Sequence, residues 1–283
     1  MYPSRHQADR ASQLLADTVR TNTTRQLPVN PTAPDFDIAA ASGWYSAVAG
    51  LLAGFALLAI LLPLDHEADD GEAVYGANGV VIYVCSFFSL LILSISYAVL
   101  AGRTGSGISG VAAHEQMLNG AAFGLATLLL LFGLHAILRT YGLNKEVFAP
   151  ASALIVTVTS VIAPVLFLAL QFSNTLDMQR YRTGGAANGI PAGVWLNLSM
   201  LAVGVVLILL VAASRSQLPS ISTAPRIISK TVLGYTVTAT IWTSIAVPLL
   251  PAEVITSAAM EHGIMGLTVL GAVAVSVASW IGR

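Results

Sequence analysis

Charged residues are scarce in this chain of 283 residues, because Asp, Glu, Lys and Arg together make up 10% of it. An ordinary soluble domain carries about 25% charged residues. Hydrophobic residues make up 55% of the sequence instead, and the formal net charge is −1. A nucleic-acid-binding protein needs a basic stripe. This charge balance does not provide one, so the composition argues against nucleic acid as a partner.

Cysteine and lysine are also rare. Cys85 is the single cysteine, so an intrachain disulfide is excluded, and its expected role is packing as a small residue. The lysines are Lys145 and Lys230. A retinal protein needs a lysine deep in its last helix, and the last apolar run has none. The sequence also lacks the nucleophile-elbow, zinc-protease and P-loop motifs.

Long apolar runs dominate what remains. A transmembrane helix needs roughly 20 mostly apolar residues. Backbone groups find no water in hydrocarbon, so a span is a helix or a barrel strand, and these runs lack the alternation of barrel strands. The sequence therefore predicts an all-α, polytopic transmembrane helical bundle in a lipid bilayer. The seven predicted spans are 43–64, 79–101, 117–138, 148–172, 191–213, 230–250 and 255–281.

The chain divides into a polar tail, residues 1–42, and a seven-helix transmembrane domain, residues 43–283. The tail has no apolar core of the kind that a signal peptide needs. It contains apolar residues at helical spacing, which predict a short amphipathic helix, with a loosely ordered tail as the alternative. These apolar residues are Ala8, Ala11, Leu14, Leu15 and Val19.

Proline and glycine predict details of the packing. Pro164 falls in the middle of the fourth span, where it cannot donate a backbone hydrogen bond, so we expect a distortion that neighbouring hydroxyl groups compensate. Gly50 with Gly54, and Gly120 with Gly124, place small residues at a spacing of four. Such pairs allow the backbones of membrane helices to approach closely.

Polar residues in three spans fall on narrow sectors of a helical wheel. We expect these sectors to face the interior of the bundle, since polar groups in a membrane avoid the lipid. They are Gln116, Thr127 and His135 in the third span, Thr236, Thr240 and Thr243 in the sixth, and Thr268 in the seventh.

Four ionisable residues form the candidate chemical site. His114 and Glu115 precede the third span, on the same side of the membrane as Glu261 and His262 at the start of the seventh. Two imidazoles and two carboxylates can bind a divalent metal such as zinc or pass a proton along. The alternative is that these side chains are solvated at the interface or make structural hydrogen bonds.

A small basic patch follows the fourth predicted span. Arg180, Tyr181 and Arg182 lie beyond its expected end at residue 172. Such a patch can meet lipid phosphates. A solvated loop is the alternative interpretation.

Three functions fit these features. The first is a transport or channel-type protein, or a membrane subunit of a larger complex, with a homo-oligomer or other membrane proteins as partners. The second is an intramembrane metal-dependent enzyme that uses the four-residue site. The third is a haem-binding redox subunit with His114 and His262 as axial ligands.

Overall fold

The computed structural model describes residues 37–61, 73–103, 109–140, 153–183, 191–219, 221 and 223–281. All regular secondary structure in these ranges is helical, which confirms the all-α prediction. Seven of the described helices are long and apolar enough to cross a membrane, as predicted. The amphipathic helix predicted in the tail lies outside the described ranges.

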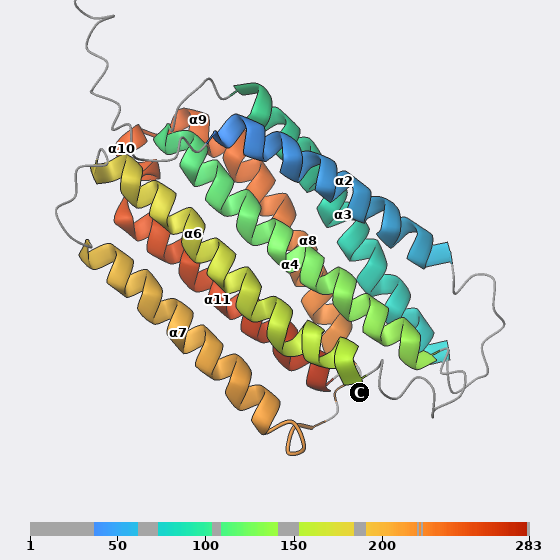
Figure 1. Ribbon diagram of the computed structural model, residues 1–283. Coiled ribbons are helices and arrows are strands. Elements are labelled where there is room, and N and C mark those ends of the chain that lie inside the picture. The colour runs from blue at the N-terminus through green and yellow to red at the C-terminus, as the bar shows by residue number, and fades with distance from the viewer. Residues whose placement is uncertain are drawn as a thin grey trace, which may run out of the picture. The chain divides into compact units, whose positions relative to one another are not determined.

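The seven spans are formed as follows. The first three are α2 (Ile38–Leu61), α3 (Ala73–Arg103) and α4 (Gly110–Thr140). The fourth begins at Ala153 and contains the π-helical turn η2 (Val158–Ile162) and α6 (Ala163–Thr183), and the fifth is α7 (Ala192–Ala213). The sixth contains α8 (Ala224–Ile241), η3 (Trp242–Ala246) and α9 (Val247–Leu249), and α10 (Ala252–Ile255) leads into α11 (Ala258–Ile281). Figure 1 shows these helices as one bundle of long, roughly aligned rods.

Five helices extend further than the apolar pattern predicted, and two of them, α2 and α3, begin at Ile38 and Ala73 instead of 43 and 79. Helix α4 begins at Gly110 instead of 117, α6 ends at Thr183 instead of 172, and α8 begins at Ala224 instead of 230. The added turns contain polar residues, several of which are buried against neighbouring helices. A hydropathy pattern ends a span at such residues, whereas the hydrogen-bonded helix continues through them.

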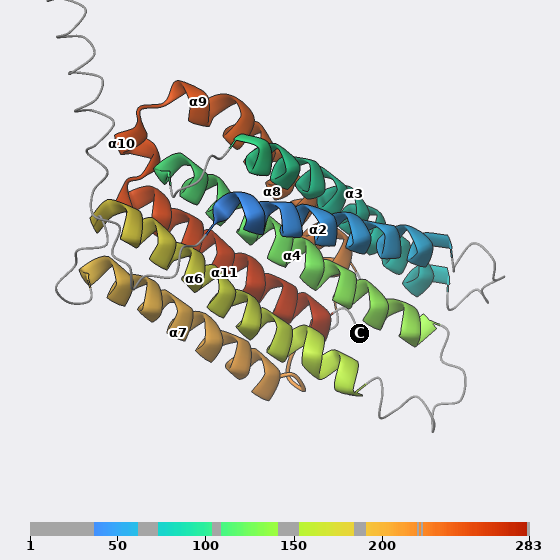
Figure 2. The ribbon, with the colours of Figure 1, turned by 45° about the horizontal axis from the view of Figure 1, so that its top comes forward.

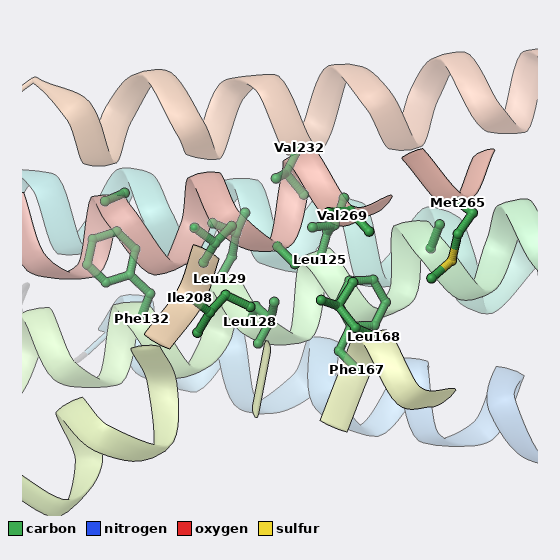
Figure 3. Close-up of a cluster of buried hydrophobic side chains, with 14 of the residues drawn as sticks. Leu125, Leu128, Leu129, Phe132, Phe167, Leu168, Ile208, Val232, Met265 and Val269 are labelled. Carbon is green, nitrogen blue, oxygen red and sulfur yellow. The ribbon is translucent and has the colours of Figure 1, made fainter. Parts of the chain in front are cut away.

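Helices α4 and α11 form the centre of the bundle. In the most apolar 18-residue window of each, 56% of the residues are buried, against 17% in α2 and α7. The main core cluster joins α4 to α6, α8 and α11 through side chains such as Leu125, Phe167, Val232 and Met265 (Figure 3). Helix α7 lies at the edge of the bundle beside α6 and α11 (Figures 1 and 2).

Small residues bring α2 against α3. A Cβ atom on Gly50 would lie 3.3 Å from the Oγ atom of Ser94. The hydroxyl groups of Ser46 and Ser94 each donate to the other residue's carbonyl oxygen, at 2.8 and 2.9 Å. The close-packing prediction is thus confirmed at Gly50 and is wrong for Gly54, where a Cβ would meet nothing within 4 Å.

The predicted distortion near Pro164 coincides with the π-helical turn η2. Proline has no N–H, so the carbonyl oxygen of Ser160, four residues earlier, loses its helical donor. The hydroxyl group of Ser276 in α11 donates to this oxygen at 2.6 Å. A neighbouring helix therefore supplies the hydrogen bond that the proline removes.

Candidate functional site

The last turns of α6 carry polar side chains on two different faces. Gln179 and Arg182, three residues apart, contact residues of α11. The other face follows the helical spacing i, i+3, i+4, i+7 and i+10, and lines a cavity next to α4. The residues of this second face are Leu170, Ser173, Asn174, Asp177 and Arg180. Helix α6 therefore separates two polar regions, which we call the Glu261 cluster and the α4–α6 groove.

The Glu261 cluster is built around a carboxylate on the first turn of α11, whose side chain is fully buried. Nε2 of Gln179 donates to both carboxylate oxygens, at 3.1 and 3.2 Å. Nη2 of Arg182 donates to Oε2, and Nδ2 of Asn197 in α7 donates to Oε1. Every side chain that contacts this carboxylate is therefore a hydrogen-bond donor.

His262 joins the cluster through Asn197. The amide nitrogen of Asn197 faces Glu261, so its Oδ1 atom is the acceptor for Nδ1 of His262 at 2.7 Å. This pairing requires a hydrogen on Nδ1 and leaves the Nε2 atom of a neutral imidazole as an acceptor. A Cβ atom on Gly193 would lie 2.6 Å from Nε2 of Gln179, so glycine lets α7 approach this closely.

The electrostatics of the Glu261 cluster are those of a buried ion pair. The Arg182 side chain is 20% exposed, and its Nη1 atom also donates to the carbonyl oxygen of Thr256 at 3.2 Å. The negative charge of Glu261 is balanced by one guanidinium and solvated by two amides. The cluster therefore ties α6, α7 and α11 together near one end of the bundle, and it leaves no free oxygen edge for a ligand.

The structure places His114 and Glu115 in other contacts. Nε1 of Trp242 in η3 donates to Nε2 of His114 at 3.2 Å. Glu115 lies 3.8 Å from Nη1 of Arg103 in α3. His114 and Glu115 thus have partners on η3 and α3, whereas Glu261 and His262 have partners on α6 and α7.

Metal binding at these positions stays a prediction, as does the haem pair His114 and His262. Among the described residues, no three His, Cys, Asp or Glu side chains lie close enough together to hold a metal ion. Each of the four residues already has a protein partner. Binding of a metal to Glu261 would displace its partners, whereas Nδ1 of His114 has no hydrogen-bond partner among the described residues.

The polar residues predicted to face the interior of the bundle differ in how far they are buried. Five members are buried, and Thr127 and Thr240 are partly buried. Hydroxyl groups of α8 and η3 are occupied within the protein, since Thr236 donates to Val232 and Thr243 to Thr240, while Thr240 pairs with Ser96 of α3 at 3.2 Å. The buried members are Gln116, His135, Thr236, Thr243 and Thr268.

The α4–α6 groove is a half-open cavity of about 350 Å³. Its wall on α4 extends from Gln116 to Leu131, which corresponds to about 22 Å along a helix. One end is apolar and is lined by Leu128, Leu131 and Leu166. Close helix contacts border the groove, because a Cβ atom on Gly124 would lie 1.9 Å from the ring of Phe167.

The other end of the groove is polar and aromatic. At this end, the polar face of α6 meets Tyr45 of α2, Tyr97 of α3 and Gln116 of α4. The hydroxyl group of Ser42 donates to Oε1 of Gln116 at 3.3 Å, and Asp177 pairs with Arg180 at 3.1 Å. The α4–α6 groove therefore has an amphiphilic lining along its length.

The sequence analysis missed most of these residues because it ended the fourth span too early. Arg182 was expected in a lipid-facing or solvated patch, but it lies on α6 and bonds to Glu261. The sequence does contain a signal for these residues, which is the helical spacing of the polar residues after residue 170. A solvated helix has the same spacing, so the signal cannot be interpreted without the neighbouring helices. Tyr97 and Asn197 are isolated polar residues in apolar runs, and the hydropathy pattern did not identify them as members of a site.

In comparisons with protein-family models, curated proteins and solved structures, the chain matches none. Its function must therefore be argued from its own geometry.

Proposed function

We propose that this integral membrane protein binds a single-chain amphiphile from the bilayer in the α4–α6 groove, as a carrier or as a subunit of a membrane complex. The observation that carries the proposal is the lining of the groove, which is apolar at one end and polar at the other. Ligand sites typically combine apolar walls with a few placed polar groups and enclose about 300–1,000 Å³. The groove meets both criteria.

The dimensions of the groove favour one chain over two. The cavity of about 350 Å³ extends along about 22 Å of α4 and is therefore long and narrow. A long, narrow cavity suits one extended hydrocarbon chain. The exposed side chains of Leu166 and Leu170 border the groove, so a molecule can enter sideways from the lipid.

A water-filled path along α8 has less support. The hydroxyl groups expected to line such a path donate to carbonyl oxygens of α8 or pair with α3. The space between α4, α8 and α11 is filled by side chains that include Met117, Val232 and Met265. These contacts favour a packed interior. The accessible space is the α4–α6 groove, which is bordered by the exposed side chains of Leu166 and Leu170.

The test narrows the groove at its mouth. Leu170 lines the groove and is 65% exposed, whereas Leu270 on α11 is 67% exposed and lies off it. We expect Leu170→Trp to reduce the amphiphile that co-purifies with the protein about tenfold, a loss of about 1.4 kcal/mol in binding. Native mass spectrometry of protein released from membranes measures this amount.

Leu270→Trp is the matched control, since it adds the same bulk to an equally exposed position. It should leave the bound fraction unchanged. Equal occupancy in the wild type and in both variants would place the bound molecules on the general lipid-facing surface and refute the proposal.

A further inference from the structure

We infer that the polar end of the α4–α6 groove takes an uncharged, planar ring with carbonyl oxygens, the chemistry of a quinone with a hydrocarbon tail. This inference rests on the proposed function, because it names the head of the same amphiphile. It depends on hydrogen-bond donors, aromatic rings and the charge balance at the polar end.

The first observation is an unused donor. Tyr97 lines the groove and is fully buried, and its hydroxyl group has no hydrogen-bond partner among the described residues. Buried hydroxyl groups normally find partners, because leaving one unpaired costs free energy. A ligand carbonyl in the groove supplies the missing acceptor.

Gln116 provides a second donor at the same end. Its Oε1 atom accepts from Ser42, so the side-chain amino group remains for a ligand. Among the described residues, none accepts a hydrogen bond from this amino group. The two donors come from α3 and α4, which suits a head group with more than one acceptor oxygen.

Three aromatic rings surround this position. The rings of Tyr45 and Tyr97 are stacked with centroids 5.3 Å apart. The ring of Phe123 meets both of them edge-on, at 5.8 and 6.3 Å. Aromatic side chains prefer stacked or edge-on neighbours. A flat ring therefore fits here better than a branched or tetrahedral head group.

The charge balance argues against an ionised head. The lining contains one arginine, Arg180, and it is already paired with Asp177, which also lines the groove. Its side chain is 57% exposed, so it lies at the rim. A carboxylate beside Tyr97 would have no cation of its own, and burying an unpaired charge is costly. The polar end is thus suited to a neutral molecule.

The test measures saturation binding of tritium-labelled decylubiquinone to the full chain in phosphatidylcholine nanodiscs, with empty nanodiscs subtracted. Tyr97→Phe removes the donor and should weaken binding about tenfold. Tyr235→Phe is the matched control, since the hydroxyl group of Tyr235 is also buried without a partner but lies off the groove. It should bind like the wild type.

A parallel titration with palmitate separates the two proposals. Saturable binding of the quinone that is weakened by Tyr97→Phe, but not by Tyr235→Phe, supports the quinone head. Palmitate binding that is sensitive to Leu170→Trp, without saturable quinone binding, overturns the quinone head and leaves single-chain binding intact. If Leu170→Trp affects neither ligand, the groove is not their site and both proposals fail.

Discussion

Replacing Arg182 by methionine is expected to lower the free energy of unfolding by about 3–5 kcal/mol, the range found when one partner of a buried ion pair is removed. The Glu261 side chain is fully buried, and Arg182 is its cationic partner. Methionine keeps much of the arginine stem but supplies no charge. The carboxylate would then rely on Gln179 and Asn197 alone. Titration with sodium dodecyl sulfate in mixed micelles, followed by circular dichroism, measures the effect.

Adding Glu261→Gln to Arg182→Met should restore most of the lost stability. Glutamine keeps an oxygen that accepts from Asn197, and the double variant holds no uncompensated charge. Replacing both members of a buried ion pair is often nearly neutral, whereas removing one is costly. The recovery distinguishes loss of charge balance from loss of packing, because the double variant restores the first and not the second.

Arg180→Met is the control for this experiment. Arg180 lies on the same helix two residues earlier, and it pairs with Asp177 through a side chain that is 57% exposed. The Asp177 side chain is 11% exposed and keeps some contact with solvent, whereas the Glu261 side chain is fully buried, so Arg180→Met should cost less than Arg182→Met. If Arg182→Met cost no more than Arg180→Met, the Glu261 cluster would not be the structural tie between α6, α7 and α11 that its contacts indicate.

Hydropathy predicted the spans well because hydrocarbon imposes one simple requirement, a continuous apolar helix of sufficient length. All seven spans were placed by this rule. The same rule misplaced the start of α4 at Gly110 and the end of α6 at Thr183, because both end turns contain polar residues. Those residues are compatible with a membrane helix since neighbouring helices supply hydrogen bonds, and a single helix does not show its neighbours.

The candidate site was less accessible to prediction. Glu261 and His262 were identified because ionisable residues near a span are costly. Their expected neighbours, His114 and Glu115, lie near the start of α4 as expected, but their partners are Trp242 and Arg103. The sequence shows which helix ends share a side of the membrane and how far along its helix each residue lies. The rotation of each helix, which decides the partner, depends on packing over the whole bundle.

Replacing Gly124 by alanine is expected to cost about 1–3 kcal/mol, the range for inserting a group into a well-packed interior. Gly124 faces α6, and a Cβ atom there would lie 1.9 Å from Cε2 and 2.0 Å from Cδ2 of Phe167. Carbon atoms that are not bonded to each other cannot approach this closely, so the Phe167 ring or the α6 backbone must move. Phe167 is buried in the main core cluster, where few alternative positions are open to it. Detergent unfolding of the purified variant measures the loss.

Gly54→Ala is the matched control, because a Cβ atom at Gly54 meets nothing within 4 Å. Alanine is the better helix former, so this variant should be as stable as the wild type or slightly more stable. Adding Phe167→Leu to Gly124→Ala should recover part of the loss, since a smaller side chain opens space for the new methyl group. A Gly124→Ala variant as stable as Gly54→Ala would show that α4 and α6 are not in close contact at this point. The wall of the groove would then be formed differently.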